Sequence, residues 1–151
     1  MTEDKVVLLV EDNPTDEALT LRALRKANVC NETVVIRDGA EALDYLFARG
    51  THAGRAAEKF PALVLLDLKL PKVDGLEVLR QLRDDPRTKL VPVVVLTSSN
   101  EDTDVIQSYA SGCNSYVRKP VDFTQFAEAL RQVGLYWLVV NSPPPGTGRT
   151  A

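Results

Sequence analysis

The sequence predicts an α/β fold in which a doubly wound, five-stranded parallel sheet is flanked by five helices. Short apolar runs rich in Val, Ile and Leu recur along the chain and are predicted to be strands. They fall at residues 6–10, 33–37, 62–66, 92–96 and 114–118. Most are continuously apolar, which is typical of parallel strands covered on both faces. Stretches with helical spacing separate them, so strands and helices alternate.

Capping signals place the helices between the strands. Asn13 stands before Pro14, which fits an N-cap and a first helical position. Asp38, Asp74 and Asp122 each precede a Glu or Gln by three residues, as in a capping box. The predicted helices cover residues 14–28, 39–49, 75–84, 102–111 and 122–139.

The length of 151 residues suits a single domain. We expect this domain to cover residues 1–140, with an extended fifth helix. Residues 141–151, NSPPPGTGRTA, are expected to form a flexible Pro/Gly-rich tail, and no effector domain is expected. The polar loop at 50–61 is unusually long for a connection within a domain.

Net charge, hydropathy and cysteine content indicate which kinds of partner and compartment to expect. The net charge is −3, and acidic and basic residues are interspersed, so we expect no direct binding of DNA. The apolar runs are far shorter than the roughly 20 residues that span a bilayer, so we expect no membrane partner. Two cysteines, Cys30 and Cys113, lack metal-ligand spacing and fit the reducing cytoplasm.

Polar residues with reactive groups follow the apolar runs. Glu11 and Asp12 end the first run, Asp67 the third and Thr97 the fourth, while the fifth leads into Lys119. Ligands of open parallel sheets bind at the carboxyl ends of the strands, so these side chains are expected to converge. Clustered carboxylates repel one another unless a cation joins them, and carboxylate oxygens suit Mg²⁺. The set predicts a phosphoryl site built around a carboxylate nucleophile.

Each of these residues has a plainer interpretation when taken alone. Glu11 and Asp12 fit a solvated strand end or a helix cap, and Asp67 fits a turn. Thr97 fits a strand, and Lys119 fits a surface charge. Their coincidence at one predicted sheet edge favours the phosphoryl site.

The motifs that carry these residues are LLVEDNPTD, LLDLKLPKVDG, VVVLTSS and SYVRKP. With them, residues 5–138 resemble the receiver domains of two-component response regulators. The resemblance implies the flavodoxin-like strand order 2-1-3-4-5. The chain is similar in particular to stand-alone receivers that pair with phytochrome-type histidine kinases, including bacteriophytochromes. This finer resemblance rests on the 50–61 loop, the segment DLKLPKVDG and the C-terminal segment GLYWLVVNSPP.

The resemblance also implies roles for individual residues. Asp67 matches the aspartate that accepts a phosphoryl group from a sensor histidine kinase, and Lys119 the lysine that binds a phosphoryl oxygen. Asp12 and Asp67 match direct Mg²⁺ ligands, with Glu11 acting through water and Lys69 through its backbone carbonyl. The Lys119–Pro120 peptide is expected to be cis.

Thr97 and Tyr116 match the switch pair of the family. On phosphorylation, Thr97 is expected to move toward the phosphoryl group and the Tyr116 ring into the vacated space. The face of the fourth helix, fifth strand and fifth helix would report this change to a downstream protein. Lys69 and Ser99 each lie two residues after a site residue and leave the phosphoryl lifetime open, including any autodephosphorylation.

Two other functions compete with this interpretation. A Mg²⁺-dependent phosphohydrolase with an aspartyl-phosphate intermediate needs a second acid two residues after the nucleophile, and Lys69 occupies that position. A flavodoxin-like electron carrier needs a Ser/Thr/Gly-rich phosphate loop after the first strand, where this chain has EDNPTDEA.

The fifth helix predicts a homodimer. Its apolar residues form two partly offset stripes that merge into LYWLVV, which leaves Leu135, Trp137 and Leu138 with too little cover from their own domain. We expect these three residues at the dimer interface. The alternatives are that this end folds back on its own subunit or that LYWLVV forms an extra strand.

Overall fold

The computed structural model describes residues 5–55, 59–99, 101–119 and 122–145. It contains a five-stranded parallel sheet in the order β2-β1-β3-β4-β5. The strands are β1 (Val7–Val10), β2 (Thr33–Ile36), β3 (Leu63–Leu66), β4 (Val93–Thr97) and β5 (Ser115–Arg118). The predicted fold class and strand order are confirmed.

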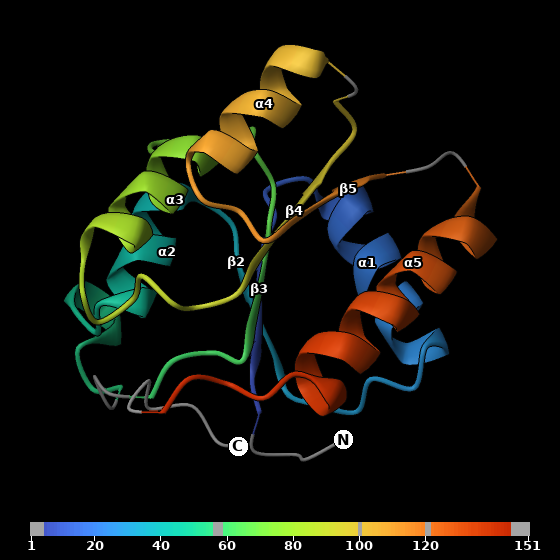
Figure 1. Cartoon of the computed structure of the whole chain (residues 1–151), viewed down its shortest axis with the longest axis horizontal. Helices are drawn as coiled ribbons and strands as arrows, with labels where there is room; N and C mark the ends of the chain where they lie inside the picture. The colour runs from blue at the N-terminus through green and yellow to red at the C-terminus, as the bar shows by residue number, and fades with distance from the viewer. Residues whose placement is uncertain (1–4, 56–58, 100, 120–121, 146–151) are drawn as a thin grey trace.

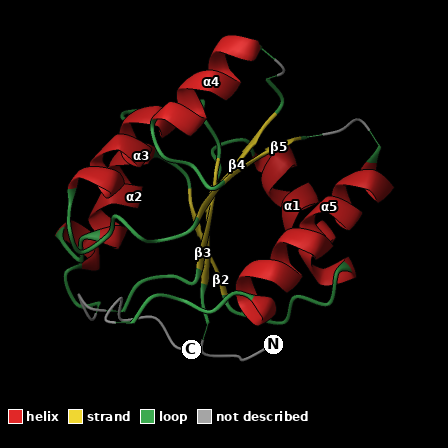
Figure 2. Cartoon of the chain, in the orientation of Figure 1, coloured by secondary structure: helices red, strands yellow, loops and turns green. Residues whose placement is uncertain are grey.

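Five α-helices cover the two faces of this sheet (Figure 1). They are α1 (Pro14–Lys26), α2 (Gly39–Leu46), α3 (Gly75–Asp84), α4 (Asp102–Ala110) and α5 (Phe123–Leu135). α1 and α5 pack together on one face, and α2 and α3 lie on the other, with α4 above α3 in this view (Figure 2). A short 3₁₀ turn, η1 (Gly50–His52), follows α2.

Alternate residues of each central strand point into different cores. In β1, Val7 and Leu9 belong to the core beneath α1 and α5, whereas Leu8 and Val10 belong to the core beneath α2 and α3. All four are at most 1% exposed. Burial on both faces explains why the sequence of this strand is apolar throughout.

The predicted caps begin the helices next to the strand ends. The side chains of Asn13, Asp38 and Asp74 each accept a hydrogen bond from the backbone N–H three residues on, at 3.0, 2.7 and 2.9 Å. Asp122 caps α5 through the N–H of Thr124 at 2.9 Å. These caps satisfy free helix donors, and the first and third fix the loops that leave β1 and β3.

The end of the fifth helix corrects the sequence interpretation. α5 continues into a π-helical turn, η2 (Tyr136–Val140), so LYWLVV does not form an extra strand. Leu138 is only 1% exposed, and its carbonyl accepts a hydrogen bond of 2.8 Å from the Lys5 ammonium. The prediction that Leu138 lacks cover was wrong, because this side chain belongs to the core beneath α1 and α5.

The other two predicted interface residues are more accessible. Leu135 is 43% exposed, while Trp137 is partly buried against the same core. Tyr136, Val139 and Val140 join Leu135 as exposed apolar residues of this segment.

Two further predictions concern residues outside those that the structure describes. The predicted cis peptide involves Pro120, which lies outside them, as do residues 146–151 of the tail. Within the described ranges, no helix has both the length and the apolar character needed to cross a bilayer.

Candidate functional site

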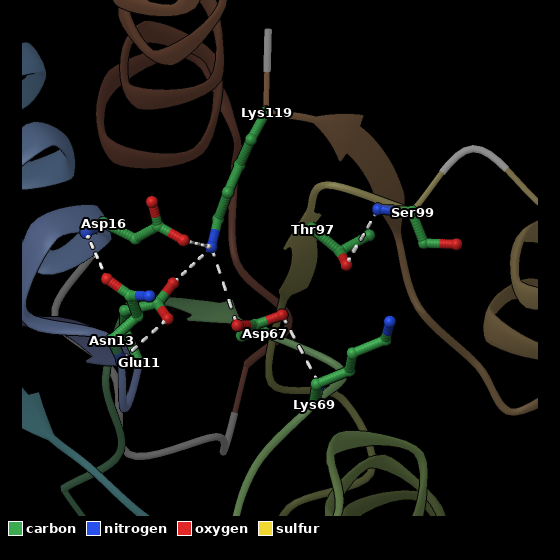
Figure 3. A network of polar contacts seen from close by, with 8 residues as sticks. All are labelled: Glu11, Asn13, Asp16, Asp67, Lys69, Thr97, Ser99 and Lys119. Atoms are coloured by element: carbon green, nitrogen blue, oxygen red, sulfur yellow. Dashed lines mark hydrogen bonds and ion pairs between the residues drawn. The ribbon is translucent and has the colours of Figure 1, made fainter. Parts of the chain in front are cut away.

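The predicted site residues meet at the carboxyl edge of the sheet. Glu11 and Asp12 follow β1, Asp67 follows β3, Thr97 ends β4 and Lys119 follows β5. Figure 3 shows Asp67 between the Lys119 ammonium on one side and the Lys69 backbone on the other. The strand order therefore brings together residues that are more than a hundred positions apart in the sequence.

Three of these residues form a compact acidic cluster. Glu11, Asp12 and Asp67 each offer a carboxylate oxygen, and these atoms all lie within 4.8 Å of one another. The pKa of Glu11 is raised to about 7, chiefly by burial. The hydrogen bond from Lys119 lowers this pKa, and the charge of Asp67 raises it. The site thus holds more negative charge than its one lysine balances. Such a set of oxygen donors fits a hard divalent cation.

Lys119 is the positive group of the site. Its ammonium donates a very short hydrogen bond to Glu11 and lies 3.1 Å from Asp16 Oδ2 and 3.6 Å from Asp67 Oδ2. Burial lowers the pKa of Lys119, but the Glu11 hydrogen bond and the charges of Asp67 and Glu11 raise it more, so the net shift is upward. The lysine stays charged beside the predicted phosphoacceptor.

The loop after Asp67 is held by its own backbone. The N–H of Lys69 lies 3.4 Å from Asp67 Oδ1, and the N–H of Gly75 donates to the Leu68 carbonyl at 2.8 Å. A Cβ atom at Gly75 would lie only 2.2 Å from the Asp67 carbonyl oxygen. Only glycine fits this close approach, which keeps the loop folded over the start of α3.

A pocket of about 420 Å³ adjoins the acidic cluster. Its lining residues come from the loops after β1 and β3 and from the first turns of α3 and α4. They are Asp12, Leu68, Lys69, Leu70, Pro71, Asp74, Leu76 and Asp104. The pocket therefore lies beside Asp12 and next to the loop that follows Asp67.

Thr97 and Tyr116 are linked through Ser99. The Ser99 N–H donates to Thr97 Oγ1 at 3.3 Å, and the Tyr116 hydroxyl donates to the Ser99 carbonyl at 3.0 Å. The Ser99 hydroxyl in turn donates to Asp104 on α4 at 2.5 Å. Ser99, two residues after the end of β4, therefore connects the predicted switch pair with the start of α4.

Two acidic residues of this region were not predicted from the sequence. Asp16 contacts Lys119, and Asp104 contacts Ser99. Both lie in the first turn of a helix, where an acid is also favoured by the helix dipole. The first-turn position of these acids is the one sequence signal for them, and it does not distinguish an acid that stabilises the helix from an acid that contacts a site residue.

Comparisons with known proteins agree with this geometry. The family model of the response regulator receiver domain matches residues 7–131. The solved bacteriophytochrome response regulator RtBRR is 53% identical, with a TM-score of 0.77, and the match covers 95% of this chain and 86% of that one. The phosphorylated cyanobacterial phytochrome response regulator RcpA is 39% identical, with a TM-score of 0.84 and coverage of 93% and 98%.

The response regulator Rcp1 of Synechocystis sp. is a further relative. It is 37% identical over 140 residues, which is 93% of each chain. A solved form of Rcp1 contains Mn²⁺ and has a TM-score of 0.82 to this structure, with 36% identity and coverage of 93% and 99%. Divalent metal binding in this relative agrees with the acidic cluster seen here.

The match over residues 7–131, the sheet order and the strand-end cluster agree on one family. Its members work in phosphorylation-based signalling and are generally not enzymes. The chain belongs to the response regulator receiver domain family.

Proposed function

We propose that this receiver accepts a phosphoryl group on Asp67 from a sensor histidine kinase, with Mg²⁺ as its cofactor. The observation that carries the proposal is the position of Asp67, whose carboxylate lies in the acidic cluster and 3.6 Å from the Lys119 ammonium. A carboxylate nucleophile, a cation site and a fixed ammonium are the groups that phosphoryl transfer to an aspartate requires.

Each residue has a distinct part in the transfer. An oxygen of Asp67 attacks the phosphorus of the kinase phosphohistidine, and the imidazole leaves. Lys119 donates hydrogen bonds to a phosphoryl oxygen. Asp12, Asp67, the Lys69 carbonyl and, through water, Glu11 would hold Mg²⁺. When bound, Mg²⁺ neutralises the charge of the phosphoryl oxygens and the carboxylates.

The path through Ser99 suggests how the signal leaves the site. Attraction of the Thr97 hydroxyl to the phosphoryl group would withdraw it from the Ser99 N–H and shift the loop that holds Tyr116. The face of α4, β5 and α5 would then change its affinity for a downstream protein. Lys69 and Ser99 lie near the acceptor and Thr97, and their side chains would influence the rate of any autodephosphorylation.

A phytochrome-type histidine kinase is the proposed partner. Support comes from RtBRR and RcpA, whose names associate them with such photoreceptors, and which match over 93% or more of this chain. We also propose a cytoplasmic location without direct DNA or membrane binding. The two unpaired cysteines, Cys30 and Cys113, agree with a reducing compartment.

We further propose a homodimer through the exposed apolar residues at the end of α5. Leu135, Tyr136, Val139 and Val140 are 43–61% exposed. The Trp137 ring packs edge-on against Tyr136, with their centroids 4.9 Å apart, and adds to this surface. Leu138 is not part of it, because its side chain is already buried.

Phosphorylation by acetyl phosphate tests the proposal. Intact-mass spectrometry should show one added phosphoryl group in the presence of Mg²⁺ and none in excess EDTA. Asp67→Asn should remain unmodified, while the control Asp74→Asn, which alters a helix cap beside the pocket, should still be modified. Full modification of Asp67→Asn, or of the wild type without divalent cations, would contradict the assignment.

A further inference from the structure

Asp16 holds the catalytic lysine on the α1 side of the site. Its Oδ2 atom lies 3.1 Å from Lys119 Nζ, nearer than Asp67 Oδ2 at 3.6 Å. In Figure 3, Asp16 and Glu11 lie on one side of the ammonium and Asp67 on the other. Lys119 is mostly buried, with its side chain 12% exposed, so its ammonium has few water molecules to replace a lost partner.

The position of Asp16 is fixed by the start of α1. Its backbone N–H donates to the Asn13 side chain at 3.0 Å, which is the cap of this helix. The Asp16 carboxylate is therefore presented to Lys119 by a rigid element. It lies outside the acidic cluster of Glu11, Asp12 and Asp67, so its role is separate from metal binding.

Asp16 opposes binding of a phosphoryl group at Asp67 in two ways. An ammonium has three N–H donors, and in this structure Glu11 and Asp16 each accept a hydrogen bond from one of them. Asp67 lies beyond hydrogen-bond distance at 3.6 Å, so the contact with Asp16 holds the ammonium away from the side where a phosphoryl oxygen would bind. The negative charge of Asp16 also lies near the place where that oxygen must bind, which is repulsive. Both effects weaken binding of the phosphoryl group.

We propose that Asp16 is a positioning residue that retains Lys119 in the unphosphorylated arrangement and weakens binding of the phosphoryl group. It thereby sets how readily the receiver switches. This inference rests on the proposed phosphorylation of Asp67, and it adds a residue that acts through Lys119 rather than on the phosphoryl group itself.

Binding of beryllofluoride, an analogue of the phosphoryl group, tests the inference by titration of the full chain in Mg²⁺. Asp16→Asn keeps the size of the side chain but removes its charge. It should bind beryllofluoride about fivefold more tightly than the wild type, which is the contribution of one partly exposed ion pair. The difference should shrink as salt is added, because such charges are screened.

Three further variants separate the possible causes. Glu17→Gln is the matched control, because Glu17 is the next residue of α1 but pairs with Arg37 at 2.9 Å. It removes the same charge and should leave the affinity at the wild-type value. Asp16→Glu restores a carboxylate and should return the affinity toward the wild type. Asp67→Asn should not bind the analogue.

The outcomes distinguish the inference from the proposed function. Equal or weaker binding by Asp16→Asn would overturn the inference, and so would a gain of the same size in Glu17→Gln. Unchanged binding by Asp67→Asn would instead contradict phosphorylation at Asp67, whatever the result for the Asp16 variants.

Discussion

Charge balance dominates the chemistry of the site at the scale of single residues. The Lys119 ammonium faces Glu11, Asp16 and Asp67, and Asp12 lies beside them at the surface. Burial is the main reason that the pKa of Glu11 is raised to about 7, so a negative charge is disfavoured in this place. A phosphoryl group adds such a charge, so its binding depends on a cation and on the release of Lys119 from its present partners.

The Thr97 hydroxyl is expected to couple phosphorylation to the rest of the domain. Thr97→Ala should still be phosphorylated, but a hydrogen bond to a charged acceptor contributes about 1.5–3 kcal/mol, so the coupling to α4 should fall by at least about tenfold. Hydrogen exchange of the amides of α4 and β5, with and without phosphorylation, measures this response. Thr97→Ser keeps the hydroxyl and is the control.

An unchanged exchange response in Thr97→Ala would show that the signal does not pass through this hydroxyl. The signal would then leave Asp67 through its other contacts, which are the Lys69 backbone and the Lys119 ammonium.

Much of the site could be predicted from the sequence because strand ends converge. Glu11, Asp67 and Thr97 each end an apolar run, and the parallel sheet brings such residues to one edge. Asp16 and Asp104 could not be found in this way. Their partners are set by the faces of α1 and α4 and by loop positions, which depend on tertiary packing.

At the scale of elements, the end of α5 shows where the sequence pattern misleads. The buried face of this helix includes Phe126, Leu130 and Gly134 and continues to Leu138. Gly134 has no side chain to add to an apolar stripe, yet it permits close packing, because a Cβ there would lie 3.0 Å from Val29. The prediction therefore followed the larger neighbouring residues and placed Leu138 outside the core.

Helix ends were predicted less well than helix beginnings. The caps at Asn13, Asp38 and Asp74 are confirmed, because a cap depends on local hydrogen bonds. The first helix was expected to reach residue 28 but ends at Lys26, and Asn28 adopts a left-handed conformation with φ of 61°. Asparagine tolerates that conformation, so the sequence also permitted an earlier end.

The burial of Leu138 predicts a large loss of stability on truncation of its side chain. Leu138→Ala should lower the free energy of unfolding by about 2–5 kcal/mol, as expected for a fully buried leucine. Leu90→Ala is the matched control, because Leu90 is 52% exposed and lies outside the proposed dimer surface, and it should change the stability by at most about 0.5 kcal/mol.

Urea unfolding followed by circular dichroism measures both variants. Because a dimer would link stability to concentration, the titrations should be compared at two protein concentrations. Similar small effects for Leu138 and Leu90 would contradict the packing described for η2.

At the scale of the whole molecule, the candidate site and the exposed apolar surface belong to different parts of the fold. The carboxyl edge of the strands holds the acidic cluster, and the end of α5 with η2 presents exposed apolar residues. The fold class and the five helices were predictable, because alternating apolar runs and capping signals agree with a doubly wound sheet. The strand order was predicted from the resemblance to receiver domains. The surface left exposed at the end of α5 was predicted only in part: Leu135 is exposed as expected, but Leu138 is buried, because the exposed set depends on which face of η2 packs inward.

The proposed homodimer predicts that one charge on this surface prevents association. Light scattering of the wild type at micromolar concentration should give about twice the chain mass of 16.6 kDa. Leu135→Glu should give a monomer, because burying an unpaired charge in an apolar interface is costly. Ile106→Glu is the control, because Ile106 is an apolar residue on α4 that is 66% exposed.

A wild-type mass near that of one chain would contradict the dimer. A dimer that survives in Leu135→Glu but is lost in Ile106→Glu would place the interface on α4 instead.

The central claim is that Asp67 carries the phosphoryl group, and locating the modified residue tests it most directly. Borohydride reduces an aspartyl phosphate to homoserine, which marks the acceptor permanently. The full chain should be phosphorylated in Mg²⁺, reduced, digested and sequenced by tandem mass spectrometry. The account predicts homoserine at residue 67 and aspartate at residues 12 and 16. Homoserine at either of those positions, or an unreduced residue 67 in fully phosphorylated protein, would contradict it.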